Sequence, residues 1–387
     1  MNYSLGNMLS RGGALNPDGL SLDLAFALDK TLTARKGPTP TFTRGSTGTF
    51  VGSNGLIQSA AINTPRFDHN PTTLASLGLL IEESRINLLN GSQTFATSGG
   101  VQNNWVDTNI TRDGTLRTSP DGTSNALRIT ASAANGTVIS SAAAGSSAAR
   151  VFSIFLRRVT GSDNIQYTLD NGSTWTTQAI TSSWVRYTFA ATTANQQVGI
   201  RIVTSGDAIE IWGAQLEAGS FPTSYIPTTT TALNRSADVC SITGANFTSF
   251  YNQSEGTMFT DSYPAAVAGT VTTFGISNGT SSARWLNRFA QNEQVVITAS
   301  GVESSLDAIN PVANQRVKVA SAAKLNDLAM SIDGLAVVTD TSQPMPTVDR
   351  AGIGNATGTT AGAVTISRIQ YFRKRLPNAK LQSLTAP

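Results

Sequence analysis

The sequence contains one histidine and one cysteine, and these shortages exclude whole classes of chemistry. Catalysis by a serine or cysteine nucleophile needs a histidine as general base. His69 follows Arg66, Phe67 and Asp68 in a turn-forming segment, where we expect it to make structural hydrogen bonds. Cys240 has no second cysteine with which to form an intramolecular disulfide. One histidine and one cysteine also cannot supply the ligands of a zinc site.

Charge is scarce as well, at 13% of residues with a net charge of +3. The small basic excess is spread along the chain, so it gives no electrostatic footprint for nucleic acid. The densest basic segment is Arg373–Arg375, with Lys380 nearby. We interpret it as a solvated surface turn, and a contact with phosphate or an anionic surface glycan stays open as the alternative.

Long apolar runs are missing too. None approaches the roughly 18 residues that span a bilayer, so we predict no membrane span. The opening Met1-Asn2-Tyr3-Ser4 is not followed by an apolar core of the kind found in a signal peptide. We therefore expect synthesis in a host cytoplasm without secretion.

What the chain does contain is threonine, valine, isoleucine and glycine, with few strong helix formers. This composition favours strands joined by tight turns and predicts an all-β protein. At 387 residues the chain is long enough for two or three domains. We predict two antiparallel β-sandwiches preceded by an N-terminal attachment arm at residues 1–20.

Residues 21–92 form a β-rich segment in this prediction. Ser21–Leu28 alternates apolar with small or polar residues, which predicts a strand. Ser53-Asn54-Gly55 predicts a hairpin turn. The block from Phe42 to Leu89, with its Pro-Arg-Phe-Asp and Gly-Leu-Leu-Ile-Glu-Glu segments, resembles phage tail and fibre proteins. Gly45, Phe50 and His69 depart mildly from that pattern.

Residues 93–228 contain several alternating segments, at 151–157, 184–189 and 198–203, which predict the strands of a sandwich. The stretch Trp212–Thr228 closes a strand, turns at Gly219 and Pro222, and enters a threonine-rich linker. This stretch resembles the end of a carbohydrate-binding-module-like jelly roll found in many tailed-phage virion proteins. The resemblance implies an extracellular β-domain displayed on a particle.

Residues 229–387 resemble a laminin-G-like or concanavalin-like sandwich through Glu255–Thr260, Leu325–Gly334 and Ile366–Arg373. Leu376–Leu384 fits a short closing helix after the last strand. Asp23-Leu24-Ala25-Phe26 looks like a laminin-G first strand. We therefore predict that residues 21–90 pack against this C-terminal sandwich, with the jelly roll inserted between the two parts.

Glycoside hydrolysis requires two carboxylates about 5 or 6.5–9.5 Å apart across the sugar. Jelly-roll glucanases carry them on one strand as Glu-x-Asp-x-x-Glu. None of the seven glutamates of this chain lies in that pattern, and the adjacent Glu82 and Glu83 would face opposite sides of a strand. Thr168–Trp175 matches the Asp-box of sialidases, which in those enzymes is a hairpin turn remote from the chemistry. We expect a structural hairpin here and predict no enzyme activity.

Sugar binding would use exposed aromatic platforms flanked by polar side chains. The candidates are Trp105 after two asparagines, Trp175 in the Asp-box, and Trp285 beside Arg284 and Asn287. A core or turn-packing role is the alternative for each. Trp184 and Trp212 alternate with apolar neighbours and are expected in a core. No cofactor is predicted; a structural calcium ion stays open, because aspartates occur in turns at Asp107, Asp121 and Asp163, but no spacing defines a site.

Together these resemblances predict a phage virion structural protein, as a tail fibre, a tail appendage or a head fibre. Its arm would bind other virion proteins, and its sandwiches would project as a homo-oligomer, with a trimer favoured, and adhere to a host surface glycan. A receptor-binding lectin with a defined glycan site is the alternative. A polysaccharide depolymerase is a more remote one, since contacts between chains of a trimer would have to build its cleft.

Overall fold

The computed structural model describes residues 18–93, 101–102, 105–141, 147–161, 164–193, 197–266, 270–290, 293–309, 311–355 and 362–387. These residues form an almost entirely β structure of antiparallel sheets with three short helices, α1 (Phe26–Asp29), α2 (Gly244–Phe250) and α3 (Asn378–Thr385). The all-β prediction is therefore confirmed. None of the described helices is long and apolar enough to cross a membrane.

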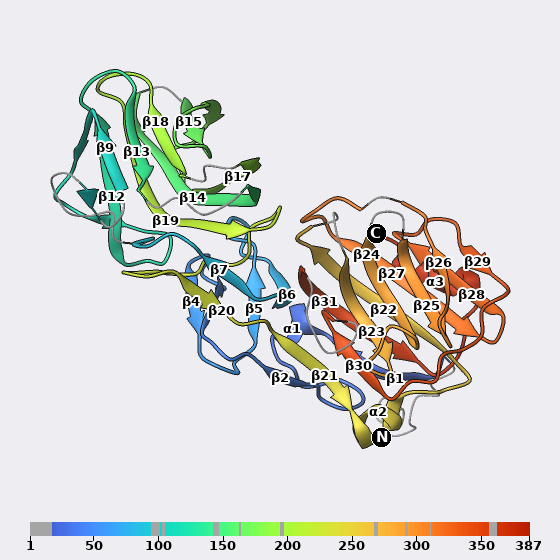
Figure 1. The fold of residues 1–387 in the computed structure, drawn as a ribbon. Coiled ribbons are helices and arrows are strands. Elements are labelled where there is room, and N and C mark those ends of the chain that lie inside the picture. The colour runs from blue at the N-terminus through green and yellow to red at the C-terminus, as the bar shows by residue number, and fades with distance from the viewer. Residues whose placement is uncertain are drawn as a thin grey trace, which may run out of the picture.

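Two large sheets form the C-terminal sandwich, shown at the right of Figure 1. The first has eight strands: β29 (Val338–Asp340), β28 (Asp327–Ile332), β27 (Val317–Lys324), β22 (Glu255–Pro264), β31 (Ala363–Phe372), β6 (Ser76–Glu82) and β5 (Arg66–His69), with β1 (Leu20–Leu24) pairing with β31. The second has seven: β2 (Thr41–Thr43), β21 (Val239–Thr243), β30 (Arg350–Ile353), β23 (Val271–Ser277), β24 (Arg284–Ala290), β25 (Glu293–Ala299) and β26 (Val302–Leu306).

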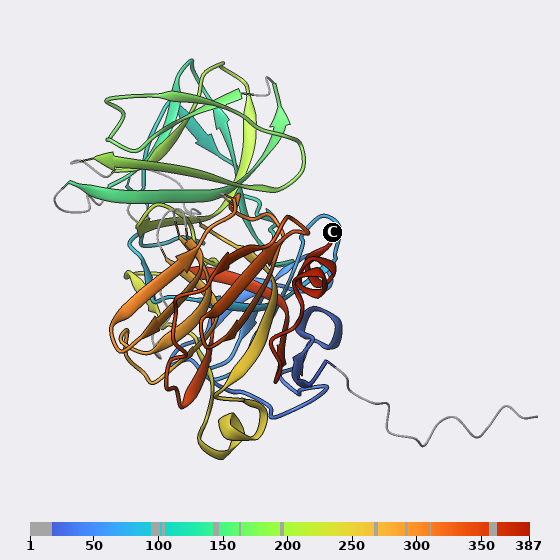
Figure 2. The ribbon, with the colours of Figure 1, turned by 90° about the vertical axis from the view of Figure 1, so that its right-hand side faces the viewer.

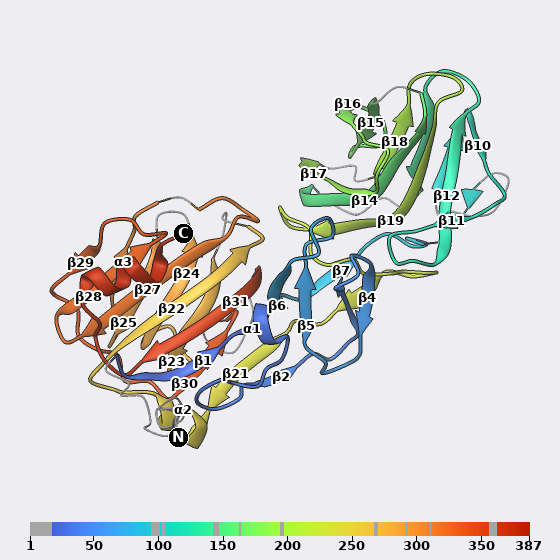
Figure 3. The same cartoon turned by 180° about the vertical axis from the view of Figure 1, so that it is seen from behind.

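Strands from the two ends of the chain share these sheets. β1 and β6 both pair with β31, with Leu24 opposite Ile369 and Leu80 opposite Thr365. Leu22, Leu24, Phe26, Leu79 and Ile81 lie in the same buried core as Trp285 and Tyr371. In Figure 3 the blue N-terminal strands accordingly lie beside red β31. The C-terminal sandwich is thus completed by N-terminal strands that the inserted residues separate from it in the sequence.

A second sandwich is inserted between β7 (Arg85–Asn87) and β20 (Leu233–Arg235). One of its sheets contains β10 (Ile110–Arg112), β12 (Ser124–Ala131), β19 (Ala208–Ala218), β14 (Ala148–Thr160) and β17 (Val185–Thr193), with β11 (Arg117–Thr118) on β12. The other contains β16 (Thr176–Ala179), β15 (Asn164–Thr168), β18 (Gly199–Ile202), β13 (Gly136–Ser140), β9 (Trp105–Thr108) and β8 (Val101–Gln102). Figure 2 shows this green sandwich at one end of the molecule and the orange-to-red C-terminal sandwich at the other.

The segment between the two sandwiches contains the pair β7–β20 and the hairpin of β3 (Gly48–Val51) and β4 (Ile57–Ala60). The Asn-Gly turn predicted at Ser53–Gly55 connects β3 to β4, and Gly55 has the positive φ of 77° that such a turn uses. Ile57 of the hairpin packs against Trp212 and Tyr225, which lie on the β12–β19–β14 sheet and on the linker that follows it. The inserted sandwich therefore turns this sheet toward the rest of the chain.

A buried ionic cluster fixes the same junction. Arg66 contacts Glu82 at 2.7 Å and Asp238 at 2.5 Å, and Arg44 contacts the other oxygen of Asp238 at 3.1 Å. The carboxylate of Glu82 also accepts hydrogen bonds of 2.6 Å from the backbone and the hydroxyl of Ser224. The linker after β19 is thus anchored to the N-terminal strands through buried polar contacts.

The strand predicted over Ser21–Leu28 was wrong in its second half. It ends at Leu24, and Phe26 begins the single turn of α1 with its side chain fully buried. Residues 1–17 of the expected attachment arm lie outside the described residues. From Asp18 onward the chain lies against the C-terminal end, where Asp18 pairs with Lys380 at 3.1 Å.

Candidate functional site

Two of the three tryptophans predicted to bind sugar lie in hydrophobic cores. Trp105 is 1% exposed in the core of the inserted sandwich, and Trp285 is fully buried in the C-terminal core. The indole of Trp285 donates a hydrogen bond of 3.1 Å to Ser321. A ring without exposed faces cannot stack on a sugar, so the binding role predicted for Trp105 and Trp285 is corrected to a core role.

Trp175 is the candidate that remains at the surface, where it is half-buried. It follows the Asp-box turn that connects β15 to β16. The carboxylate of Asp170 accepts hydrogen bonds from the backbone and hydroxyl of Thr174, at 2.9 and 2.7 Å. Gly172 has a φ of 78°, and a Cβ there would lie 3.3 Å from the Trp175 ring. The turn thus fixes the position of the ring while leaving part of it in solvent.

Arg201 on β18 stacks on this ring, with its guanidinium carbon 4.4 Å from the ring centroid. The stacked guanidinium is held in place by Gln166 on β15, whose side-chain oxygen accepts a hydrogen bond of 2.7 Å from Nε of Arg201. Cation–π stacking of this kind is worth about 0.5–1 kcal/mol at an exposed site. Trp175, Arg201 and Gln166 therefore form one ordered unit, which we call the Trp175 platform.

The platform continues as a polar row across the sheet. The register places Thr177, Gln166, Arg201, Thr137 and Thr108 directly opposite one another on five adjacent strands. Their neighbours along the strands, Ile165, Ile200 and Val138, point into the core. Because side chains alternate across a strand, the polar row faces outward.

This outward face also points away from the rest of the chain. The other sheet of the inserted sandwich carries Trp212, which packs against Ile57 of the junction. In Figure 1 the inserted sandwich lies at the end of the molecule opposite the C-terminal sandwich. The Trp175 platform is therefore accessible to a large ligand such as a surface polymer.

A hollow of about 350 Å³ lies between β15 and β17, on the face of β15 opposite to Gln166. It is lined by Tyr167, Asp170, Thr174, Thr176 and residues 190–193 of β17. Its volume falls at the lower end of the range for small-molecule sites, and hydroxyl and carboxylate oxygens line its polar part. These oxygens offer hydrogen-bond partners to a sugar, while the ring of Trp175 lies on the other face of the sheet.

Trp184, the other half-buried tryptophan, is engaged inside the protein. Its indole donates a hydrogen bond of 3.2 Å to the backbone oxygen of Thr118, and the guanidinium carbon of Arg157 lies 4.9 Å from its ring. It also packs against the cluster of Trp212 and Tyr225. Trp184 was expected in a core; it lies at the partly exposed edge of one.

Six glutamate carboxylates in the described part of the chain, those of Glu82, Glu83, Glu210, Glu217, Glu255 and Glu303, are held by arginines or by hydrogen bonds. Buried Glu210 contacts Arg128 at 2.8 Å and Arg157 at 2.5 Å. The remaining partners are Arg66 for Glu82, Arg85 for Glu83, Thr223 for Glu217, the backbone of Arg375 for Glu255, and Arg284 for Glu303. Burial by itself would raise the pKa of Glu82, but the charges of Arg235 and Arg66 outweigh it and lower the pKa to about 2. Such a carboxylate stays ionised and cannot act as a general acid near neutral pH.

The aspartates considered for calcium have protein partners where they are described. Asp107 pairs with Arg112 at 2.5 Å, and Asp121 accepts hydrogen bonds from Ser119 and Thr123 at 2.5 and 2.7 Å. Asp163 lies outside the described residues. Within the described part of the chain no group of three or more histidine, cysteine, aspartate or glutamate side chains is placed to hold a metal ion.

Sequence reasoning missed Arg201 and Gln166. The alternation in Gly199-Ile200-Arg201-Ile202 does indicate that Arg201 faces away from the core. What the sequence does not indicate is which strands are neighbours, and only the pairing of β15 with β18 brings Gln166 and Arg201 beside the Trp175 turn.

No protein-family model and no curated protein matches the chain. Among solved structures, the CBM40 module of a Ruminococcus gnavus sialidase bound to α2,3-sialyllactose is 17% identical, with 35% of this chain and 84% of that chain covered and a TM-score of 0.31. The NanB sialidase from Streptococcus pneumoniae is 15% identical, with 37% and 26% covered and a TM-score of 0.31. The receptor-binding domain of botulinum neurotoxin type G is 11% identical, with 38% and 39% covered and a TM-score of 0.30. Likeness at this level carries no functional inference.

Proposed function

We propose that this chain is a structural subunit of a phage particle and that its inserted sandwich adheres to glycans on the host surface. The observation that carries the adhesive role is the Trp175 platform, an ordered aromatic ring with stacked Arg201 on the sheet of the inserted sandwich that does not pack on the junction. The placement on a particle is supported by the resemblance of residues 42–89 and 212–228 to tail and fibre proteins. The N-terminal arm would bind other virion proteins.

Weak sites suit such a role when many copies are displayed together. A partly exposed ring with one arginine and one glutamine offers few contacts, so a single platform would bind a glycan weakly. In a homotrimer, which is the favoured assembly, linking three platforms raises the overall affinity through effective concentration. Binding rather than hydrolysis is also supported by the arginine pairing of Glu82 and Glu210.

The test is glycan binding by the full chain and two matched variants. Trp175→Ala removes the platform, and Trp184→Ala removes a half-buried tryptophan from the opposite sheet of the same sandwich. On an array of bacterial surface glycans, we expect Trp175→Ala to weaken binding about fivefold, since stacking on an aromatic ring is worth about 1 kcal/mol. Trp184→Ala should retain binding as long as it remains folded. Equal binding by the wild type and Trp175→Ala would rule out the platform as the adhesive site.

The hollow between β15 and β17 favours the second candidate, a receptor-binding lectin with one defined glycan site. The two proposals differ in selectivity. A defined site would bind one glycan class, and Thr176→Val or Thr192→Val at the wall of the hollow would change which glycan is bound. A platform used for general adhesion would bind many glycans and would not respond to these two substitutions.

A further inference from the structure

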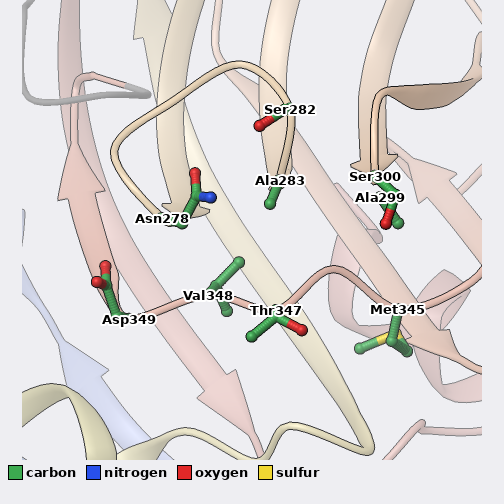
Figure 4. Close-up of a pocket in the computed structure, with 9 residues that line it drawn as sticks. All are labelled: Asn278, Ser282, Ala283, Ala299, Ser300, Met345, Thr347, Val348 and Asp349. Atoms are coloured by element: carbon green, nitrogen blue, oxygen red, sulfur yellow. The ribbon is translucent and has the colours of Figure 1, made fainter.

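A second hollow, of about 380 Å³, lies on the C-terminal sandwich and shares no residue with the Trp175 platform. It is formed by the loop between β23 and β24, the turn between β25 and β26, and the segment that leads into β30 (Figure 4). Its lining residues are Asn278, Ser282, Ala283, Ala299, Ser300, Met345, Thr347, Val348 and Asp349. Nothing in the adhesive role proposed above uses this hollow.

Backbone hydrogen bonds hold the three segments in place. Gly301 N–H donates to Ser282 O at 3.1 Å, which joins the two turns, and Asp349 N–H donates to Ser277 O at 3.0 Å. The side chain of Gln253 donates a hydrogen bond of 2.6 Å to Pro346 O and so supports the third segment. The hollow is therefore a preformed feature whose walls are fixed by the ends of the sheet.

The floor of the hollow is apolar because small side chains end the strands there. Ala283 directly precedes β24 and Ala299 ends β25; they are 8% and 4% exposed, and Val348 is 9% exposed. The small side chains of these two alanines leave open the space that larger side chains would fill. An apolar floor of this size suits the C–H face of a sugar ring or another small compact ligand.

The rim of the hollow carries both hydrogen-bond donors and hydrogen-bond acceptors. The amide oxygen of Asn278 accepts from the backbone and hydroxyl of Thr280, at 3.0 and 2.7 Å, so this oxygen is engaged within the loop. Figure 4 shows the amide nitrogen of Asn278 directed toward the middle of the hollow, with Ser282 above it and Asp349 below it on the same side. An amide N–H donates and a carboxylate accepts, and a hydroxyl group can satisfy both at once.

The charge of the site is balanced. Asp349 pairs with Arg350 at 2.7 Å, while the Asp349 side chain remains 61% exposed and open to a ligand. A balanced ion pair gives little attraction for an ion of either sign. The combination of an apolar floor, a neutral rim and paired donors and acceptors selects a neutral ligand rich in hydroxyl groups.

We propose that the hollow between Asn278 and Asp349 is a second binding site, for a neutral sugar residue with neighbouring hydroxyl groups. Asn278 donates to and Asp349 accepts from these hydroxyls, while Ala283, Ala299 and Val348 contact the ring face. The site goes beyond the adhesive role of the inserted sandwich and does not depend on it. Each chain would then bind glycans at both of its ends.

The experiment is saturation-transfer NMR of the full chain with methyl α-glucopyranoside, methyl α-galactopyranoside and methyl α-mannopyranoside. We expect saturable binding of at least one glycoside in the millimolar range, the affinity usual for a single small site with few contacts. Ala299→Phe fills the hollow and Asp349→Asn removes the acceptor charge, and each should reduce the affinity at least fivefold. Trp175→Ala should leave this binding unchanged, which separates the pocket from the platform.

Three results would overturn the proposal. These are no saturable binding of any of the three glycosides to the wild type, unchanged binding in Asp349→Asn, and binding that is lost in Trp175→Ala but kept in Ala299→Phe. Circular dichroism checks that each variant is folded. If Ala299→Phe does not fold, Asp349→Asn decides alone, because Asp349 is exposed and its replacement leaves the core intact.

Discussion

Replacing Asp238 by asparagine should destabilise the junction between the two sandwiches. Asp238 is fully buried and faces the fully buried guanidinium groups of Arg44 and Arg66, and it also accepts a hydrogen bond of 2.8 Å from the backbone of Glu82. Asparagine has nearly the same side-chain volume as aspartate but carries no charge. The carboxylate of Glu82 would then be left to balance the positive charges of these arginines. Breaking a buried pair in this way costs about 3–5 kcal/mol.

Scanning calorimetry measures the effect. The inserted sandwich has a core of its own, so we expect two transitions, and Asp238→Asn should lower the one that belongs to the C-terminal sandwich. At the usual unfolding entropy of a unit of 150–250 residues, the loss corresponds to a shift of roughly 6–20 °C. The control is Asp29→Asn, which breaks the surface pair with Arg35 and should leave both midpoints unchanged. A shift for Asp238→Asn no larger than that of the control would refute the reasoning.

Two further predictions concern stability. Gly78 has a φ of 119°, and a Cβ there would lie 2.0 Å from the backbone oxygen of Ile366, so Gly78→Ala should cost at least about 2 kcal/mol in urea unfolding. Gly206→Ala, with a φ of 88° and open space around it, should cost less; equal losses would contradict this assignment. Burial raises the pKa of Asp68 to about 6, so the folded state binds this proton more tightly than the unfolded state. The resulting stability is fully present below about pH 4 and is lost as the pH rises through 6, by about 2–3 kcal/mol. Asp68→Asn should flatten this part of the wild-type pH profile of unfolding, and a profile identical to that of the wild type would exclude Asp68 as its source.

The local features of the fold could be read from the sequence because they depend on neighbouring residues. The Asn-Gly turn at Ser53–Gly55 and the Asp-box turn at Thr168–Trp175 both have their expected hydrogen-bonding residues within a few positions. The strands of both sandwiches could be predicted for the same reason, because the alternation of apolar and polar residues is a local pattern. The helix turn at Phe26 was missed because the apolar pattern of Ala25, Phe26 and Leu28 is also compatible with a strand.

The error on Trp285 has a definite cause. Arg284 and Asn287 made the ring look surface-exposed, but Arg284 points to the other face of β24 because neighbours along a strand alternate. Asn287 is buried, and its side-chain oxygen accepts a hydrogen bond of 2.6 Å from the hydroxyl of Ser321. The same hydroxyl accepts the hydrogen bond from the Trp285 indole. A buried polar network around a tryptophan is indistinguishable in sequence from a polar binding rim.

The candidate sites needed the three-dimensional structure because their residues come from separate segments. The Trp175 platform joins β15, the turn after it and β18, and the hollow of the C-terminal sandwich joins three loops between Asn278 and Asp349. Pairing across such distances follows from sheet order, which a single sequence does not specify. Trp175 itself could be named as a candidate from the sequence, because the Asp-box pattern of its turn is recognisable there.

The most direct test of the account is cryo-electron microscopy of phage particles that contain this chain, incubated with and without the glycan selected on the array. The account predicts that the chain is displayed as an oligomer with its inserted sandwich outermost, and that glycan density appears over Trp175 and Arg201. Absence of the chain from the particle, or glycan density away from the β15–β18–β13 face, would contradict it.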